Sequence, residues 1–170
     1  MGTTGILGED DWVELLDGEI VSMTPIGPVH AAVVDRLNRL LGQRLGERAI
    51  VRVQNPIRLA GHSEPRPDLA LLQPRDDFYQ RAHPEPPEVL LVIEVADSSI
   101  AIDRAVKVPL YADAGIPEVW IVDLSGRRVV VHREPDEGVY TRIDIARPGG
   151  IVHPAAFDDL TLMVDEILGE

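Results

Sequence analysis

The stretch from residue 89 to residue 95 constrains the fold of this chain more than any other part of its sequence. It reads Val-Leu-Leu-Val-Ile-Glu-Val, an aliphatic run interrupted by a single charge, Glu94. Such a run is typical of a strand that is covered on both faces, as the central strands of α/β sheets usually are. We therefore expect an α/β fold in which helices flank a mixed central sheet.

The rest of the sequence supplies the other elements of that fold. Apolar residues recur at helical spacing from His30 to about Leu45, which predicts a helix. Segments bounded by turn signals predict strands at residues 19–23, 50–59, 68–72 and 119–122. Residues 129–132 and 139–145 are expected to form a C-terminal hairpin, and residues 159–168 a short strand or helix. From residue 30 to residue 122 the expected order is helix, three strands, helix, strand.

The helix expected before the strand at 119–122 ends at Gly115. Ser98 and Ser99 are suitable N-cap residues, and Asp103 in the first turn favours the helix dipole. Pro109 is expected to kink or interrupt the helix. The buried stripe of this helix is predicted to consist of Ile102, Val106 and Leu110.

Length and composition limit the class of protein. A chain of 170 residues is expected to form one domain over residues 1–170, with a core at about 19–123 and an extension at about 124–170. It has no cysteine, which excludes disulfides and thiolate metal sites and fits a reducing compartment. No apolar stretch approaches the roughly 20 residues of a membrane span, and the start does not resemble a signal peptide. We therefore expect a cytoplasmic protein.

The net charge of −13 bears on the partners of the chain. A protein that holds nucleic acid by charge alone is usually basic, so strong nonspecific DNA binding is not expected. An acidic balance is compatible with a metal-dependent site, because the carboxylates that bind a divalent metal are negative and the metal bridges protein to phosphate. Of the 16 lysines and arginines, only Lys107 is a lysine.

Two carboxylates stand out because of where the expected strands place them. Asp68 follows Pro67 at the start of a strand, and Glu94 lies inside the aliphatic run, where burying an unpaired charge is strongly unfavourable. Taken alone, Asp68 also fits a turn aspartate, and Glu94 also fits a structural ion pair. On neighbouring strand ends, both acids can share one Mg²⁺ or Mn²⁺ ion, whose shell leaves positions for water and phosphate.

A lysine is expected near such a metal, because an ammonium group orients the attacking water or stabilises the charge that develops on phosphorus. Lys107 lies on the helix after Glu94, at the flank of the predicted buried stripe; a surface lysine is the alternative. For the secondary candidates the alternatives are surface placement, capping or packing. These candidates are Glu64 in the turn before Asp68, Glu19 on the first strand, and His30 at the start of the first helix.

Several motifs together resemble one known family. They are Ser63-Glu64-Pro65-Arg66-Pro67-Asp68, Val92-Ile93-Glu94-Val95, Asp103-Arg104 with Lys107 and Tyr111, residues 114–123, and, near the start, Asp17-Gly18-Glu19 and His30. Over nearly the whole chain this set resembles the Uma-two family, described as restriction endonucleases, a branch of the PD-(D/E)xK nuclease superfamily. The core of that superfamily is αβββαβ, the order that periodicity predicts above.

The resemblance implies a metal-dependent endonuclease that hydrolyses DNA phosphodiester bonds, with Asp68 as the motif aspartate and Glu94 as the second acid. Ala96 stands where the superfamily pattern has a lysine, and Lys107 matches the family's lysine on the next helix. The alternative is a nuclease-shaped module that has kept its fold but serves as a binding or regulatory partner. The one reason to expect a homodimer is that cutting both strands of a duplex commonly involves two subunits.

Overall fold

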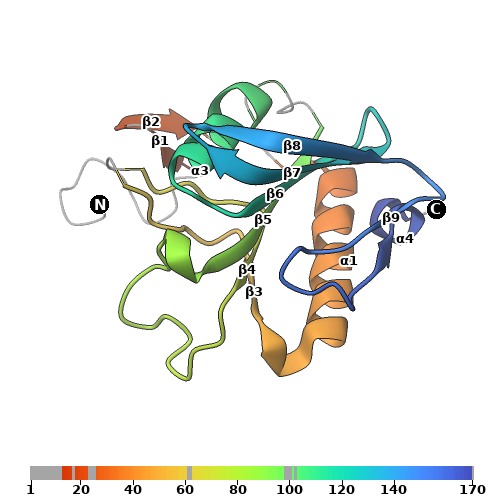
Figure 1. The fold of residues 1–170 in the computed structure, drawn as a ribbon, viewed down its shortest axis with the longest axis horizontal. Helices are drawn as coiled ribbons and strands as arrows, with labels where there is room; N and C mark the ends of the chain where they lie inside the picture. The colour runs from red at the N-terminus through yellow and green to blue at the C-terminus, as the bar shows by residue number, and fades with distance from the viewer. Residues whose placement is uncertain are drawn as a thin grey trace.

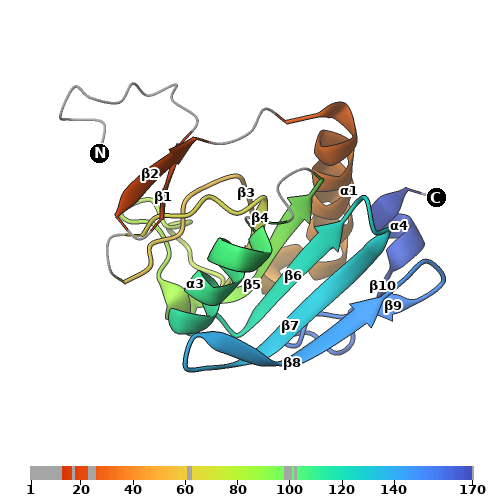
Figure 2. The same cartoon turned by 90° about the horizontal axis from the view of Figure 1, so that it is seen from above.

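A mixed sheet forms the centre of the fold (Figures 1 and 2). The computed structural model describes residues 13–16, 18–22, 26–60, 63–97, 101 and 103–169. Within these ranges the central sheet has six strands in the order β3-β4-β5-β6-β7-β8. Strands β5 and β6 are parallel, and the other neighbouring strands are antiparallel. The strand bounds are Ile50–Val53 (β3), Leu69–Leu72 (β4), Val89–Ala96 (β5), Glu118–Asp123 (β6), Arg128–Asp136 (β7) and Val139–Ala146 (β8).

Helices cover both faces of this sheet (Figure 2). α1 (Pro28–Leu45) and α4 (Val164–Leu168) pack on one face, and the π-helical turn η3 (Asp103–Lys107) and α3 (Val108–Asp113) pack on the other. The remaining elements are small. They are β1 (Val13–Leu16) paired with β2 (Glu19–Ser22), β9 (Ile151–Val152) paired with β10 (Leu162–Met163), and the 3-10 turns η1 (Gly46–Arg48) and η2 (Pro86–Glu88).

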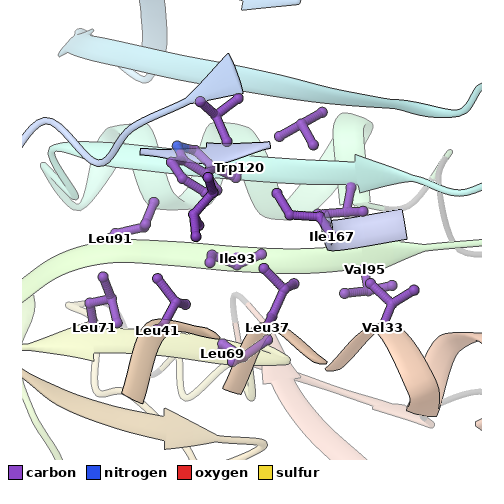
Figure 3. Packing of buried hydrophobic residues seen from close by; sticks show 14 of the residues in the cluster. Val33, Leu37, Leu41, Leu69, Leu71, Leu91, Ile93, Val95, Trp120 and Ile167 are labelled. Atoms are coloured by element: carbon purple, nitrogen blue, oxygen red, sulfur yellow. The ribbon is translucent and has the colours of Figure 1, made fainter. Parts of the chain in front are cut away.

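The larger apolar cluster lies between the sheet and α1 (Figure 3). α1 presents Val33, Leu37 and Leu41 at helical spacing, and the strands meet them with Leu69 and Ile93. Alternate strand residues point to the other face, where they pack under α3 in a second cluster. Strand β5 is therefore covered on both faces, as its aliphatic sequence predicts.

The predicted fold class is confirmed. α1, β3, β4, β5, α3 and β6 follow one another in the expected αβββαβ order. The predicted C-terminal hairpin is formed by β7 and β8, and it continues the central sheet beyond β6. The tail contains both a short strand, β10, and a short helix, α4.

Two predictions about individual elements are wrong. The strand expected at residues 50–59 ends at Val53, because Gln54 has a left-handed backbone (φ 52°) and Pro56 lacks the N–H that a ladder needs. Val106, expected to be buried, is 44% exposed. Several residues of the predicted turns, strands and caps lie outside the described residues: Asp17, Met23, Gly61, Ser98, Ser99 and Ile102.

Candidate active site

Asp68 and Glu94 lie next to each other at one end of the β4–β5 pair. Leu69 pairs with Ile93, so the next position places Asp68 opposite Glu94 on the same face of the sheet. The backbone N–H of Asp68 points to Glu94 Oε2 at 3.4 Å, and Asp68 Oδ2 accepts a hydrogen bond from the backbone N–H of Val95 at 2.8 Å. Both residues are buried. The structure thus brings the two predicted acids together.

Lys107 approaches this acid pair from the helical layer. Its Nζ lies 3.0 Å from Glu14 Oε1, 3.3 Å from Glu94 Oε1 and 3.8 Å from Asp103 Oδ1. Burial opposes the charged form of the ammonium, but the negative charges of Glu94, Glu14 and Asp103 outweigh burial and raise the pKa of Lys107. Lys107 is therefore protonated at neutral pH, so it can donate hydrogen bonds or stabilise negative charge but cannot act as a base.

The position of Lys107 follows from the irregular start of the helix after β5. Asp103–Lys107 form a π-turn, and α3 begins at Val108 with Pro109 in its first turn. Pro109 has no N–H with which to continue an α-helical ladder, although proline is well tolerated in a first turn. π-turns are rare and often occur at functional sites. Here the turn leaves Asp103 and Lys107 buried and Val106 at the surface.

Glu14 and Asp103 belong to the cluster, although neither was predicted as a site residue. Glu14, on β1, is 5% exposed and also accepts a hydrogen bond from the backbone N–H of Arg66 at 2.8 Å. The sequence contained a signal for Glu14, because it is a charge within the apolar segment Val13–Leu16. Asp103, predicted to favour the helix dipole and part of the family motif Asp103-Arg104, is 3% exposed. Its burial depends on the π-turn, and apart from that motif no signal in the sequence indicated it.

His30 and Gln54 hold the carboxylate of Asp68 in place. His30 Nε2, on α1, donates to Asp68 Oδ2 at 3.0 Å, and Gln54 Nε2 donates to Asp68 Oδ1 at 3.3 Å. The hydrogen bond to Asp68 raises the pKa of His30 against the opposing effect of burial. Gln54 reaches Asp68 from a left-handed backbone conformation that a non-glycine residue rarely adopts, and such strain is common at functional sites. The secondary candidate His30 thus joins the site, and Gln54 was missed.

Glu94 bears the clearest electrostatic signature of the site. Tyr111 Oη donates to Glu94 Oε1 at 2.7 Å. Burial raises the pKa of Glu94 to about 8; Lys107 opposes this shift, whereas Asp68, Asp103 and Glu14 add to it. Among the described residues, the buried carboxylates Glu14, Asp68 and Glu94 together contact one ammonium, Lys107, and one histidine, His30, so they have an excess of negative charge. Without a further cation, the cluster reduces this excess by keeping a proton on Glu94 at neutral pH.

Glu118 shows how a structural ion pair is made in the same sheet. This fully buried acid on β6 accepts hydrogen bonds from Trp120 Nε1 and Arg133 Nε at Oε1, both at 2.8 Å, and from the backbone N–H of Ala155 at Oε2. One guanidinium therefore balances one acid. The cluster around Glu94 differs because its acids outnumber its cations, and structural pairing alone does not account for it.

The other sequence candidates lie elsewhere. The carboxylate of Glu64 is bound by Arg58 Nε at 3.2 Å, and the Glu64 backbone pairs with Leu15. Glu19 is exposed on β2. Ala96, at the position where the superfamily pattern has a lysine, is fully buried in the cluster under α3. The ammonium that contacts Glu94 therefore comes from Lys107 on the adjacent helical layer.

The acid pair has the chemistry of a site for a hard cation. Mg²⁺ and Mn²⁺ prefer oxygen ligands, and Mg²⁺ is commonly held by one or two carboxylates while water completes its shell. In the described part of the chain, no three His, Asp or Glu side chains are arranged to hold one metal ion. A cation would therefore depend on Asp68 and Glu94 together with water. Both the donor chemistry and the negative excess of the cluster fit such an ion.

The αβββαβ order, the mixed sheet and the acidic cluster at its edge define a nuclease-like α/β protein. The chain belongs to the Uma2 family, the Uma-two family that its motifs resemble; the family model is described as "Putative restriction endonuclease" and matches residues 6–165. A crystal structure described as "a putative nuclease" from Anabaena variabilis ATCC 29413 has a similar fold, with a TM-score of 0.68 and 16% sequence identity over 92% of this chain and 89% of that chain. No curated protein matches.

None of the helices that the structure describes is long and apolar enough to cross a membrane.

Proposed function

We propose that this chain is a metal-dependent endonuclease that hydrolyses the phosphodiester bonds of DNA. Asp68 and Glu94 are the proposed ligands of Mg²⁺ or Mn²⁺, and Lys107 is the third proposed catalytic residue. The proposal depends on one observation above all: within the described residues, the buried acids Glu14, Asp68 and Glu94 outnumber the basic side chains that contact them. Membership of a restriction endonuclease family and the nuclease-like fold support it.

Each group of the chain has a separate role in this proposal. The bound metal would polarise the scissile phosphate and lower the pKa of the attacking water. His30 and Gln54 fix the orientation of Asp68. Lys107 and Tyr111 bind Oε1 of Glu94, while Oε2 lies on the side of Asp68. Because Lys107 stays protonated, it orients water or stabilises the charge that develops on phosphorus and does not remove a proton.

Cleavage of supercoiled plasmid DNA tests the proposal. We expect nicked and linear products with Mg²⁺ or Mn²⁺ and no cleavage with EDTA. The rate of cleavage should fall by at least about 100-fold in Asp68→Ala, because the variant lacks one of the two proposed metal ligands. Asp144→Ala is the matched control, since Asp144 is an exposed acid on β8. Full activity of Asp68→Ala, or no metal-dependent cleavage of any nucleic acid, would contradict the proposal.

The alternative is a nuclease-fold module that binds or regulates a partner without catalysis. Ala96 at the usual lysine position and the net charge of −13 favour this alternative. Calorimetry with Mn²⁺ separates the two functions. A working site binds the ion and loses it in Asp68→Asn and Glu94→Gln but not in the control Asp144→Asn, whereas a module without a metal site gives no heat of binding in any of these proteins.

A further inference from the structure

Arg52 and Arg66 are unusual among the arginines of this acidic chain. Both are half-buried, and neither guanidinium has a carboxylate partner within the ranges that the structure describes; Arg52 lies over the ring of Tyr79, 5.9 Å from its centroid. Arg52 Nη1 and Arg66 Nε are buried donors without a hydrogen bond. The other half-buried arginines of the described chain each donate to a carboxylate or a carbonyl: Arg36, Arg44, Arg128 and Arg133.

This lack of carboxylate partners is informative because acids are abundant. The chain has 29 acidic residues against 16 lysines and arginines. An unpaired, partly desolvated guanidinium is unfavourable, and in a protein with surplus carboxylates a partner is easily provided. Two such arginines in one region therefore point to an anion from outside the described part of the chain.

The two arginines lie in one basic patch, which we define as Arg52, Arg58, Arg66 and His83. Burial lowers the pKa of His83, and the positive charges of all three arginines lower it further, whereas Glu64 opposes the shift. Backbone hydrogen bonds join the segments that carry them: Arg58 N–H donates to Pro84 at 2.8 Å, and Ile57 N–H donates to Pro65 at 3.0 Å. Of these four residues, Arg58 alone has a carboxylate partner in the part of the chain that the structure describes, and this partner is Glu64.

The basic patch adjoins the candidate active site. The backbone N–H of Arg66 donates to Glu14 Oε1, the atom that also binds Lys107. Arg52 lies on β3, an edge strand of the central sheet, where it pairs with Ala70, two residues beyond Asp68. An extended ligand that reaches Asp68 along this edge would therefore pass the patch.

We propose that Arg52 and Arg66 bind phosphate groups of a DNA strand and hold it against the acid pair; this inference rests on the proposed function. A guanidinium binds phosphate through two parallel hydrogen bonds. With a net charge of −13 the molecule as a whole repels DNA, so attraction requires a local concentration of positive charge. The partly buried stems limit the freedom of both guanidiniums, which reduces the entropy lost on binding.

Salt-dependent binding of a fluorescent duplex DNA oligonucleotide tests this inference. Binding is measured in Ca²⁺ without turnover, on the full chain and on Arg52→Gln, Arg66→Gln and the double variant. Each single change is expected to weaken binding by about three- to tenfold and to reduce the slope of log affinity against log salt by about 1. Arg142→Gln, on the opposite edge strand β8, is the matched control and should leave affinity and slope unchanged.

Unchanged affinity and slope in the folded double variant would overturn the inference. Circular dichroism and thermal unfolding of each variant establish that it is folded. Arg52→Lys and Arg66→Lys keep the charge and lose the two-pronged geometry, so their affinities should lie between those of the native chain and the glutamine variants.

Titration with Mn²⁺ alone separates this inference from the proposed function. Neither arginine is a proposed metal ligand, so the double variant should bind Mn²⁺ as the native chain does. If the arginine variants bind DNA normally while Asp68→Asn abolishes Mn²⁺ binding and cleavage, the basic patch is wrong and the nuclease stands. If they lose DNA binding while the native chain neither binds Mn²⁺ nor cleaves DNA, the patch serves the binding module instead.

Discussion

Lys107 balances the buried acids, so its removal should destabilise the chain. Lys107→Met keeps most of the apolar stem but leaves Glu14, Glu94 and Asp103 without their ammonium. Removal of one partner of a buried ion pair costs about 3–5 kcal/mol, and we expect a loss of this size in the free energy of unfolding measured in urea. The control Arg142→Met removes an exposed guanidinium and should cost less than about 1 kcal/mol. Equal losses in both variants would contradict this role of Lys107.

His30 acts on the reaction through Asp68, as a positioning residue. We expect His30→Asn to reduce both Mn²⁺ affinity and the rate of cleavage by about 10- to 100-fold, as loss of a residue that orients a metal ligand commonly does. The fold should be retained. Calorimetry and single-turnover cleavage measure the two quantities, with His153→Asn as the control. A purely structural role would instead change the unfolding midpoint and leave Mn²⁺ affinity intact.

A charged residue inside an apolar segment is the clearest local signal of a buried acid. Glu94 was predicted in this way because it interrupts an aliphatic strand. Glu14 also interrupts an apolar segment, but this segment is shorter and Glu14 was not predicted. Gln54 could not be predicted, because its contact with Asp68 depends on a left-handed backbone conformation, and the sequence has no glycine at this position to indicate one. Local sequence therefore identifies buried charges better than the polar residues that orient them.

At the scale of single elements, the helix after β5 departs most from its sequence pattern. Periodicity predicted burial of Val106, but the buried apolar residues are Val108, Tyr111 and Ala112. A π-turn contains more residues than an α-helical turn, so it displaces the buried face along the chain. Pro109 correctly predicted an irregular helix. The position of the irregularity could not be predicted, because it also depends on the contacts of Lys107 with Glu14 and Glu94.

Two matched valine substitutions test this displaced face. Val108→Ala removes buried methyl groups and should lower the free energy of unfolding by about 1.5 kcal/mol. Val106→Ala removes the same groups from a surface position and should change it by less than about 0.5 kcal/mol. Urea unfolding measures both. The reverse order of losses would mean that the helix is regular and buries Val106.

Over the whole molecule, the sheet was easier to predict than the site at its edge. Strands β4, β5 and β6 consist mainly of apolar residues because both faces of the sheet are covered, and this pattern can be read locally. The site joins segments that are remote in sequence: Glu14 and Lys107 are 93 positions apart. Long-range contacts of this kind have no local signal. The expected strand order and the family resemblance together linked Asp68, Glu94 and Lys107, and neither identified Glu14.

The acid excess should also make the stability of the metal-free molecule depend on pH. The pKa of Glu94 is about 8 in the folded chain and near the ordinary 4.5 in the unfolded chain, so between these values the folded state holds the extra proton. This contribution to stability is complete below the unfolded pKa and is lost as pH rises through 8. His30, whose pKa is raised by Asp68, has an effect of the same sign above its ordinary pKa of 6.5.

We therefore expect the free energy of unfolding in EDTA to fall by on the order of 3 kcal/mol between about pH 5 and about pH 9. Glu94→Gln, which imitates the protonated acid, should lose most of this dependence. Mn²⁺ competes with the proton for Glu94, so it should raise the unfolding midpoint more at the alkaline end than at the acidic end. Thermal unfolding across this pH range measures all three effects. Stability in EDTA that rises with pH, or a profile that Glu94→Gln leaves unchanged, would show that the acids around Glu94 carry no excess charge for a metal to neutralise.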